Sequence, residues 1–87
     1  MSDERKKLTL TASGMKHLQA LRGNPRRSQG ATIQMAVLNR VANFGNGRIS
    51  ERNLISDIPE FVSISRQGSK NIVKRMKQRG WLREITV

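Results

Sequence analysis

The segment ATIQMAVLNRVANFG at 31–45 constrains the fold of this chain more than any other. Its apolar residues recur every three to four positions, which predicts an α-helix, and they form a stripe too wide for a helix that lies on a surface. The residues of this stripe are Ile33, Met35, Val37, Leu38, Val41, Ala42 and Phe44. The segment is therefore predicted to be the central core helix, ended by the glycine-rich turn at 45–47.

Ahead of this helix, the sequence predicts a strand and a shorter helix. The LTLT segment at 8–11 alternates with the period of a β-strand. A helix is predicted over about 12–22, capped by Thr11 or Ser13 and ended by Gly-Asn-Pro, which opens a loop at 23–30. Ser28 is predicted to cap the core helix.

Behind the core helix, Ile49 is predicted to form a very short strand, and Ser50 to cap another helix with Glu51 in its first turn. Pro59 is predicted to end that helix, because the residue before a proline avoids the helical region. Three apolar residues after the proline are predicted to enter the core: Phe61, Val62 and Ile64.

The net charge of the 87 residues is +11, unevenly distributed. Residues 1–30 carry net +5, residues 31–64 are neutral, and residues 65–87 carry net +6. Such a field attracts polyanions, so nucleic acid is the first candidate partner and an anionic membrane surface the second. With six acids, one histidine and no cysteine, we expect neither an enzyme nor a metal or other cofactor. No apolar run approaches the roughly 20 residues of a membrane span, and we expect a cytoplasmic protein.

The C-terminal charge is concentrated in SISRQGSKNIVKRMKQRGWL at 63–82, which contains no acid. A helix is predicted over about 66–79, starting after the N-cap Ser65 and ending at Gly80. Its narrow apolar stripe, made of Ser69, Ile72, Val73 and Met76, places it on the surface of the domain. After it, Trp81 and Leu82 are predicted to start a strand that continues through REITV.

The exposed side of this helix has two interpretations. Basic residues on a surface helix are often merely solvated, and the helix dipole favours cations in the last turn. The alternative is insertion into a DNA groove, because Arg and Lys bind guanine edges or phosphates and Asn and Gln bind adenine. Under this hypothesis the base-reading residues are Arg66, Gln67, Lys70 and Asn71. The phosphate-binding residues in the same segment are Ser65, Lys74, Arg75 and Lys77.

Further basic residues form three smaller groups. An N-terminal arm, residues 1–7, carries Arg5, Lys6 and Lys7, and such arms reach minor grooves. Phosphate contacts are predicted for Arg26 and Arg27 in the loop at 23–30, and for Arg48 and Arg52 around the start of a helix. Each group has a simpler interpretation as solvated surface.

Two aromatic residues are given structural or incidental roles. Trp81 could stack on a nucleic-acid base, but its apolar neighbour Leu82 favours packing in the core or an interface. His17, in the first predicted helix, is interpreted as incidental.

The segment ISRQGSKNIVKRMKQRGWLRE resembles the recognition-helix region of bacterial winged helix-turn-helix regulators, especially MarR-like proteins. The matching positions are Ile64, Ser65, Ser69, Ile72, Val73, Met76, Gly80, Trp81 and Leu82. The resemblance extends over about 31–84, with RISERNLISDI as the preceding strand and helix. It implies a mainly α fold with a small sheet, formed here by one domain over 8–87.

The chain departs from the family pattern twice. The connection DIPEFVS is longer than the usual turn, and the chain ends before a wing hairpin is complete. One hypothesis is that LTLT at 8–11 pairs with WLREITV and supplies the missing strand, within one chain or between subunits. The alternative is an extended, unpaired N-terminal tail.

Together, these features predict a sequence-specific binder of double-stranded DNA that acts as a transcriptional or plasmid- or phage-type replication regulator. We expect a homodimer, because two half-sites give useful specificity and isologous dimers are common. Two alternatives remain: a non-specific nucleic-acid-packaging or RNA-binding protein, and a module that docks onto an acidic protein.

Overall fold

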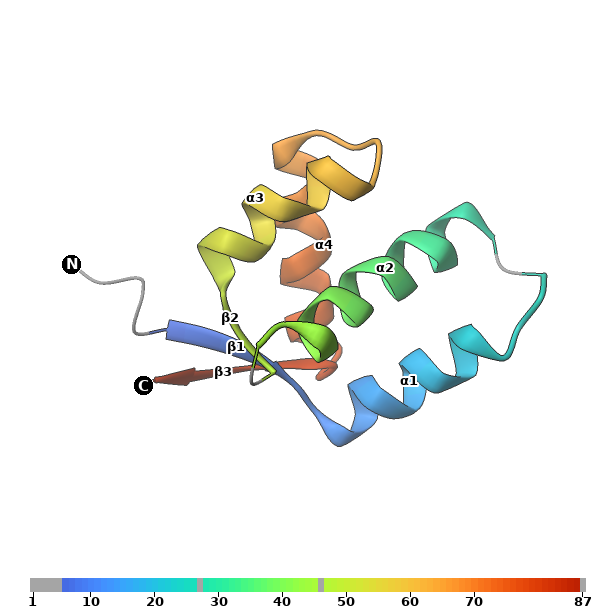
Figure 1. Cartoon of the computed structure of the whole chain (residues 1–87), viewed down its shortest axis with the longest axis horizontal. Coiled ribbons are helices and arrows are strands. Elements are labelled where there is room, and N and C mark those ends of the chain that lie inside the picture. Colours follow the sequence, from blue (N-terminus) through green and yellow to red (C-terminus); the bar gives the residue numbers. More distant parts are fainter. Residues whose placement is uncertain (1–5, 27, 46, 87) are drawn as a thin grey trace.

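A computed structural model of the chain describes residues 6–26, 28–45 and 47–86. These residues form a mainly α-helical fold with a small three-stranded antiparallel sheet, as predicted (Figure 1). The elements, in chain order, are β1 (Lys6–Leu10), α1 (Ala12–Arg22), α2 (Gln29–Asn43), β2 (Arg48–Ser50), α3 (Glu51–Phe61), α4 (Arg66–Gln78) and β3 (Leu82–Thr86). Helix α1 packs on α2, and α3 packs on α4 (Figure 1).

The N-terminal strand lies in the middle of the sheet, whose order is β2-β1-β3. Leu8 is opposite both Ile49 and Glu84, and Leu10 is opposite Leu82. The predicted pairing of the N-terminal and C-terminal strands is therefore confirmed, and it occurs within one chain. Because the two strands are antiparallel, the start of β1 and the end of β3 lie at the same end of the sheet (Figure 1).

Strand β1 begins two residues earlier than predicted. Lys6 and Lys7, which were assigned to a basic arm, form the first two residues of the strand and pair with β3. The alternation that predicted the strand was visible only from Leu8 onward, because lysine side chains do not reveal a buried face. Arg5 lies outside the described residues.

Helix α2 is the central helix of the core, as predicted. Val37, Leu38 and Val41 are fully buried, whereas Ile33 and Met35 are half-buried and pack against the core. The remaining fully or nearly fully buried apolar residues come from every other element: Leu8, Leu18, Leu21, Ile49, Leu54, Ile58, Val73, Met76 and Leu82. The helix starts after the predicted N-cap Ser28, whose hydroxyl accepts a hydrogen bond from the Ala31 N–H.

Thr11 connects the start of α1 to the turn between α4 and β3. Its hydroxyl oxygen accepts the Gly14 N–H at 3.0 Å, and its own N–H donates to the Trp81 carbonyl at 3.0 Å. Gly14 sits so close to this turn that a Cβ there would overlap the Trp81 carbonyl oxygen and lie 2.9 Å from Leu10 Cδ1. Glycine at position 14 therefore permits the close approach of α1 to the C-terminal part of the chain.

The prediction that Pro59 ends α3 is wrong. The helix continues to Phe61, and the Val62 N–H donates to the Ile58 carbonyl at 2.9 Å. A proline in the last turn removes a single helical hydrogen bond, and the conformational preference of the residue before it is not an absolute barrier. As a result, the connection to α4 consists of the four residues 62–65, which is the usual length for a helix-turn-helix.

The extension of α3 also changes the environment of Phe61. This residue was predicted to enter the core, but it is 42% exposed at the end of the helix. Val62 and Ile64 are half-buried and pack against the core, as predicted. Phe61 lies instead over a shallow hollow beside the outer side of α2, near Arg40.

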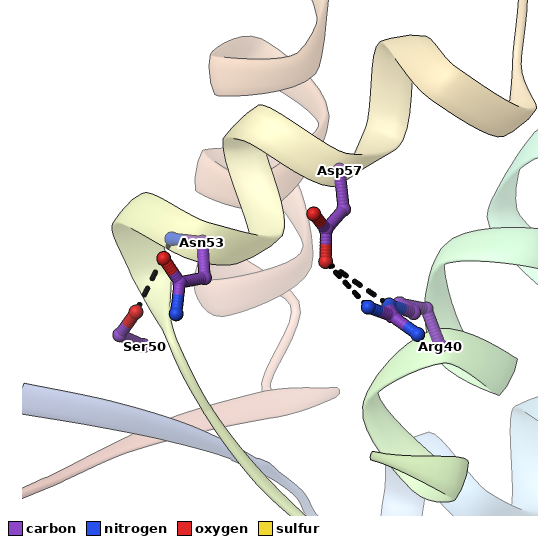
Figure 2. Close-up of polar contacts among 4 residues, drawn as sticks. All are labelled: Arg40, Ser50, Asn53 and Asp57. Carbon is purple, nitrogen blue, oxygen red and sulfur yellow. Dashed lines mark hydrogen bonds and ion pairs between the residues drawn. The ribbon is translucent and has the colours of Figure 1, made fainter.

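Two polar contacts fix the direction of α3 (Figure 2). The Ser50 hydroxyl accepts the Asn53 N–H at 3.2 Å and caps the helix, as predicted. Arg40 of α2 donates from Nε and Nη2 to the same carboxylate oxygen of Asp57, at 3.1 and 2.7 Å. This ion pair joins α2 to the middle of α3 across the fold.

Candidate functional site

The candidate site is built on α4, whose two ends are defined by local chemistry. The Ser65 hydroxyl accepts the Gly68 N–H at 3.0 Å, which confirms the predicted N-cap. At the other end, Gly80 adopts a φ of 77°, and the Trp81 N–H donates to the Met76 carbonyl at 3.0 Å. A glycine in the left-handed conformation, followed by a residue whose N–H donates back to a helical carbonyl, commonly ends a helix.

The predicted apolar stripe of α4 faces the core. Ser69, Val73 and Met76 are almost fully buried, and Ile72 is half-buried. The Ser69 hydroxyl donates to the Ser65 carbonyl at 3.0 Å, so this buried polar group is satisfied. Burial of one side holds the helix on the surface and leaves the opposite side exposed.

The outward side of α4 carries amides and cations. With about 100° between successive residues of a helix, the positions opposite the buried stripe are Gln67, Asn71, Lys74 and Gln78, with Lys70 and Arg75 at the two edges of this side. All six are exposed. The Gln67 Nε2 atom donates to the Asn71 Oδ1 atom at 3.4 Å, so the two amides are adjacent on successive turns. Gln78 was not among the predicted site residues, although its helical spacing from Gln67 and Lys74 indicates the same side.

One flank of α4 borders a polar groove of about 310 Å³. Its lining residues come from four elements: Lys6, Glu51, Arg52, Ile55, Arg66, Lys70 and Glu84. The groove therefore brings Arg66 and Lys70 together with Arg52. Lys6 joins them from strand β1, which sequence reasoning had placed in a separate arm.

Lys77, which the sequence predicts to bind phosphate, is paired with two acids. Its Nζ lies 2.6 Å from a carboxylate oxygen of Glu51 and 3.5 Å from one of Glu84. The hydrogen bond to Glu51 raises the pKa of Lys77 above the ordinary lysine value, despite an opposing effect of burial. Lys77 thus joins α4 to α3 and β3, and its charge is compensated by two acids at the surface of the fold. The sequence gives no local sign of this, because the partners lie 26 and 7 residues away.

The other flank of α4 borders a mostly apolar hollow of about 160 Å³ beside the start of α2. Arg75 and Arg79 lie at this hollow, on the side of α4 away from Lys70. The Arg79 guanidinium is positioned 5.1 Å from the centre of the Trp81 ring. Arg75 is exposed, so it remains a candidate phosphate ligand on this second flank.

His17 is not incidental, contrary to prediction. Its ring stacks on Trp81, with centroids 3.9 Å apart and planes 14° from parallel. Its Nε2 lies 3.1 Å from Oε1 of Gln34, within hydrogen-bond distance. The structural role favoured for Trp81 is confirmed, because its half-buried ring packs against the core and His17.

Two of the other predicted phosphate ligands lie apart from the groove beside α4. Arg26 is in the loop between α1 and α2, which lies at the far end of the helices from the sheet (Figure 1). Arg48 is exposed on strand β2 and does not line the groove. Arg27 lies outside the described residues.

The charge balance around α4 remains strongly positive. Among the described acids, Glu51 and Glu84 bind Lys77, and Asp57 binds Arg40. Helix α4 itself contains no acid. No cluster of three or more metal-binding side chains occurs within the described part of the chain. None of its helices there is both long enough and apolar enough to cross a lipid bilayer.

Comparison with protein families, with curated proteins and with solved structures found no significant match to this chain.

Proposed function

We propose that the protein is a winged helix-turn-helix regulator that binds double-stranded DNA and inserts α4 into the major groove. The observation that carries the proposal is the division of α4 into two sides. One side is buried by Ser69, Val73 and Met76, whereas the other presents only cations and amides. An α-helix of this kind fits the width of the major groove of B-DNA.

The arrangement of elements supports this proposal. The order α2, β2, α3, four-residue turn, α4 and β3 corresponds to the order that the family resemblance implies. Strand β1 lies between β2 and β3, where it supplies the strand that a wing hairpin would otherwise add. A three-stranded sheet therefore forms without a second strand after β3.

The proposed roles follow the position of each side chain on α4. Gln67 and Asn71, adjacent on the outward side, suit bidentate contact with adenine. Arg66 and Lys70 stand beside them and suit guanine edges or nearby phosphates. The remaining exposed cations around the helix suit the flanking phosphates: Lys6, Arg52, Lys74 and Arg75. Ser65 contributes as the helix cap, since its hydroxyl is engaged by the Gly68 N–H.

We also propose that the protein acts as a homodimer. A single helix of 13 residues reaches few base pairs, whereas two copies related by a twofold axis read two half-sites about 34–36 Å apart. A twofold dimer should bind a palindromic target, so this proposal can be tested directly.

Selection of bound duplexes from a random pool, combined with mass measurement of the complex, tests the proposal. We expect a recurrent palindromic sequence, two protein chains per duplex and an affinity at least about 10³ times higher than for random duplex at the same salt. Binding of all duplexes with equal affinity would instead indicate non-specific packaging. A preference for single strands or RNA would contradict α4 insertion into a DNA groove.

A further inference from the structure

A second basic surface lies on the outer face of the sheet. Side chains alternate between the two faces of a strand, so Lys7 and Thr9 point away from the face that carries the buried Leu8. In the register of the sheet, Thr9 is opposite both Arg48 and Arg83. Residues directly opposite each other share a face. Lys7, Arg48 and Arg83 therefore lie together on the outer face.

The outer face points away from the groove beside α4. Lys6 and Glu84, each one residue away from an outer-face cation, lie on the inner face and line that groove. The inner face also carries Leu8, Ile49 and Leu82, which are buried in the core. The sheet thus separates the proposed α4 interface from the cations of the outer face.

The charge on the outer face is not compensated locally. By register, the outer-face positions of strands β1, β2 and β3 are Lys7, Thr9, Arg48, Ser50, Arg83 and Ile85, none of which is acidic; Ser50 among them is buried and caps α3. The ion pairs among the described residues involve Arg40 and Lys77, and not these three cations. Arg48 and Arg83 are two strands apart, about 10 Å, so the positive potentials of the three cations overlap within about one Debye length.

We propose that this outer face binds the phosphate backbone of a second DNA segment, so that one molecule bridges two duplexes. The inference rests on the proposed function, in which α4 occupies the first duplex. The guanidinium groups of Arg48 and Arg83 match phosphate geometry. The face carries no aromatic residue for base stacking, and its one large apolar side chain, Ile85, is half-buried. This composition favours sequence-independent contact with phosphates over insertion into a lipid bilayer.

A duplex-capture assay tests the inference with the full chain. One duplex that carries the selected target is immobilised, and capture of a second, labelled random duplex is measured at fixed salt. The test variant is Arg48→Gln/Arg83→Gln. A matched control, Lys16→Gln/Arg22→Gln, removes the same charge from exposed positions on α1. A second test variant, Lys7→Gln/Arg83→Gln, leaves β2 unchanged.

We expect both test variants to bind the immobilised duplex within about threefold of the wild-type affinity but to capture at least tenfold less of the second duplex. The control should capture as the wild type does. Wild-type-like capture by the test variants, or an equal loss in the control, overturns the inference.

A wild-type protein that binds one duplex and captures no second one overturns it while the proposed function stands. Failure to bind any duplex removes the proposed function itself. Binding of anionic phospholipid vesicles in place of the second duplex also overturns the inference.

Discussion

The ammonium group of Lys77 lies 2.6 Å from the carboxylate of Glu51, which joins the C-terminal half of α4 to the first turn of α3. Glu84 of β3 approaches the same ammonium group at 3.5 Å. Three elements around the candidate site therefore meet at one side chain. This contact orients α4 relative to the groove that contains Arg52 and Arg66.

The first prediction concerns the pH dependence of this contact. The pKa of Lys77 is raised in the folded chain, chiefly by the hydrogen bond to Glu51, so the contribution of the pair to stability is fully present below the ordinary value of 10.5. It is lost as the pH rises through the higher pKa of the folded state. We expect Glu51→Gln to lower the free energy of unfolding by about 0.5–1 kcal/mol at pH 8. Urea titrations should show this difference shrinking above pH 10.5; a difference that grows there would contradict the assignment.

The second prediction separates Lys77 from Lys74 in duplex binding. Lys77 is compensated by two acids, whereas Lys74 is exposed on the outward side. We expect Lys74→Gln to weaken binding of all duplexes and to reduce the slope of log affinity against log salt by about one. Lys77→Gln should leave that slope nearly unchanged at a temperature where the variant is folded. An equal reduction of the slope by both substitutions would indicate that Lys77 contacts DNA phosphates as Lys74 does.

The third prediction concerns the two amides of α4. Gln67→Ala and Asn71→Ala should each relax the preference at one or two base pairs of the selected target, at a cost of about 1–3 kcal/mol for the preferred base. Binding to random duplex should change little, because an amide carries no charge. The measurement is a competition series with single-base-pair variants of the target. A uniform loss over all sequences, as expected for Lys74→Ala, would argue against base reading.

The fourth prediction tests the close contact between α1 and the C-terminal turn. A Cβ at Gly14 would overlap the Trp81 carbonyl oxygen, so we expect Gly14→Ala to destabilise the fold by about 1–3 kcal/mol. Gly30→Ala is the matched control, since a Cβ there has 4.0 Å to its nearest neighbour. Alanine at position 30, in the first turn of α2, should stabilise the fold slightly, by about 0.4–1 kcal/mol. Thermal unfolding of both variants checks the pair, and equal melting temperatures would show that α1 does not approach the turn this closely.

Helix ends and helix faces were predictable because their signals are local. Ser28, Ser50 and Ser65 each cap the helix that the sequence predicted for them, through hydrogen bonds to an N–H three residues on. The buried stripe of α4 likewise follows from the spacing of Ser69 and Val73 along one helix. The two sides of α4 were therefore accessible from sequence, whereas the pairing of Lys77 with Glu51 and Glu84 was not.

Contacts between distant residues were decided by the tertiary structure. His17 meets Trp81 because α1 packs beside the turn after α4, and no local pattern connects two residues so far apart. Pro59 remains helical although its local preference predicted an end, since one lost hydrogen bond did not prevent the last turn from forming.

The sequence by itself determined that a basic helix would present cations and amides to solvent. The tertiary structure decided which cations join it and which do not. Lys6 enters the groove and Lys7 does not, because a strand alternates its faces and β1 lies between β2 and β3. Lys77 is half-buried and paired with acids, because the fold brings Glu51 and Glu84 to it. Side-chain spacing within one element is a local property, whereas strand order and register depend on the whole chain.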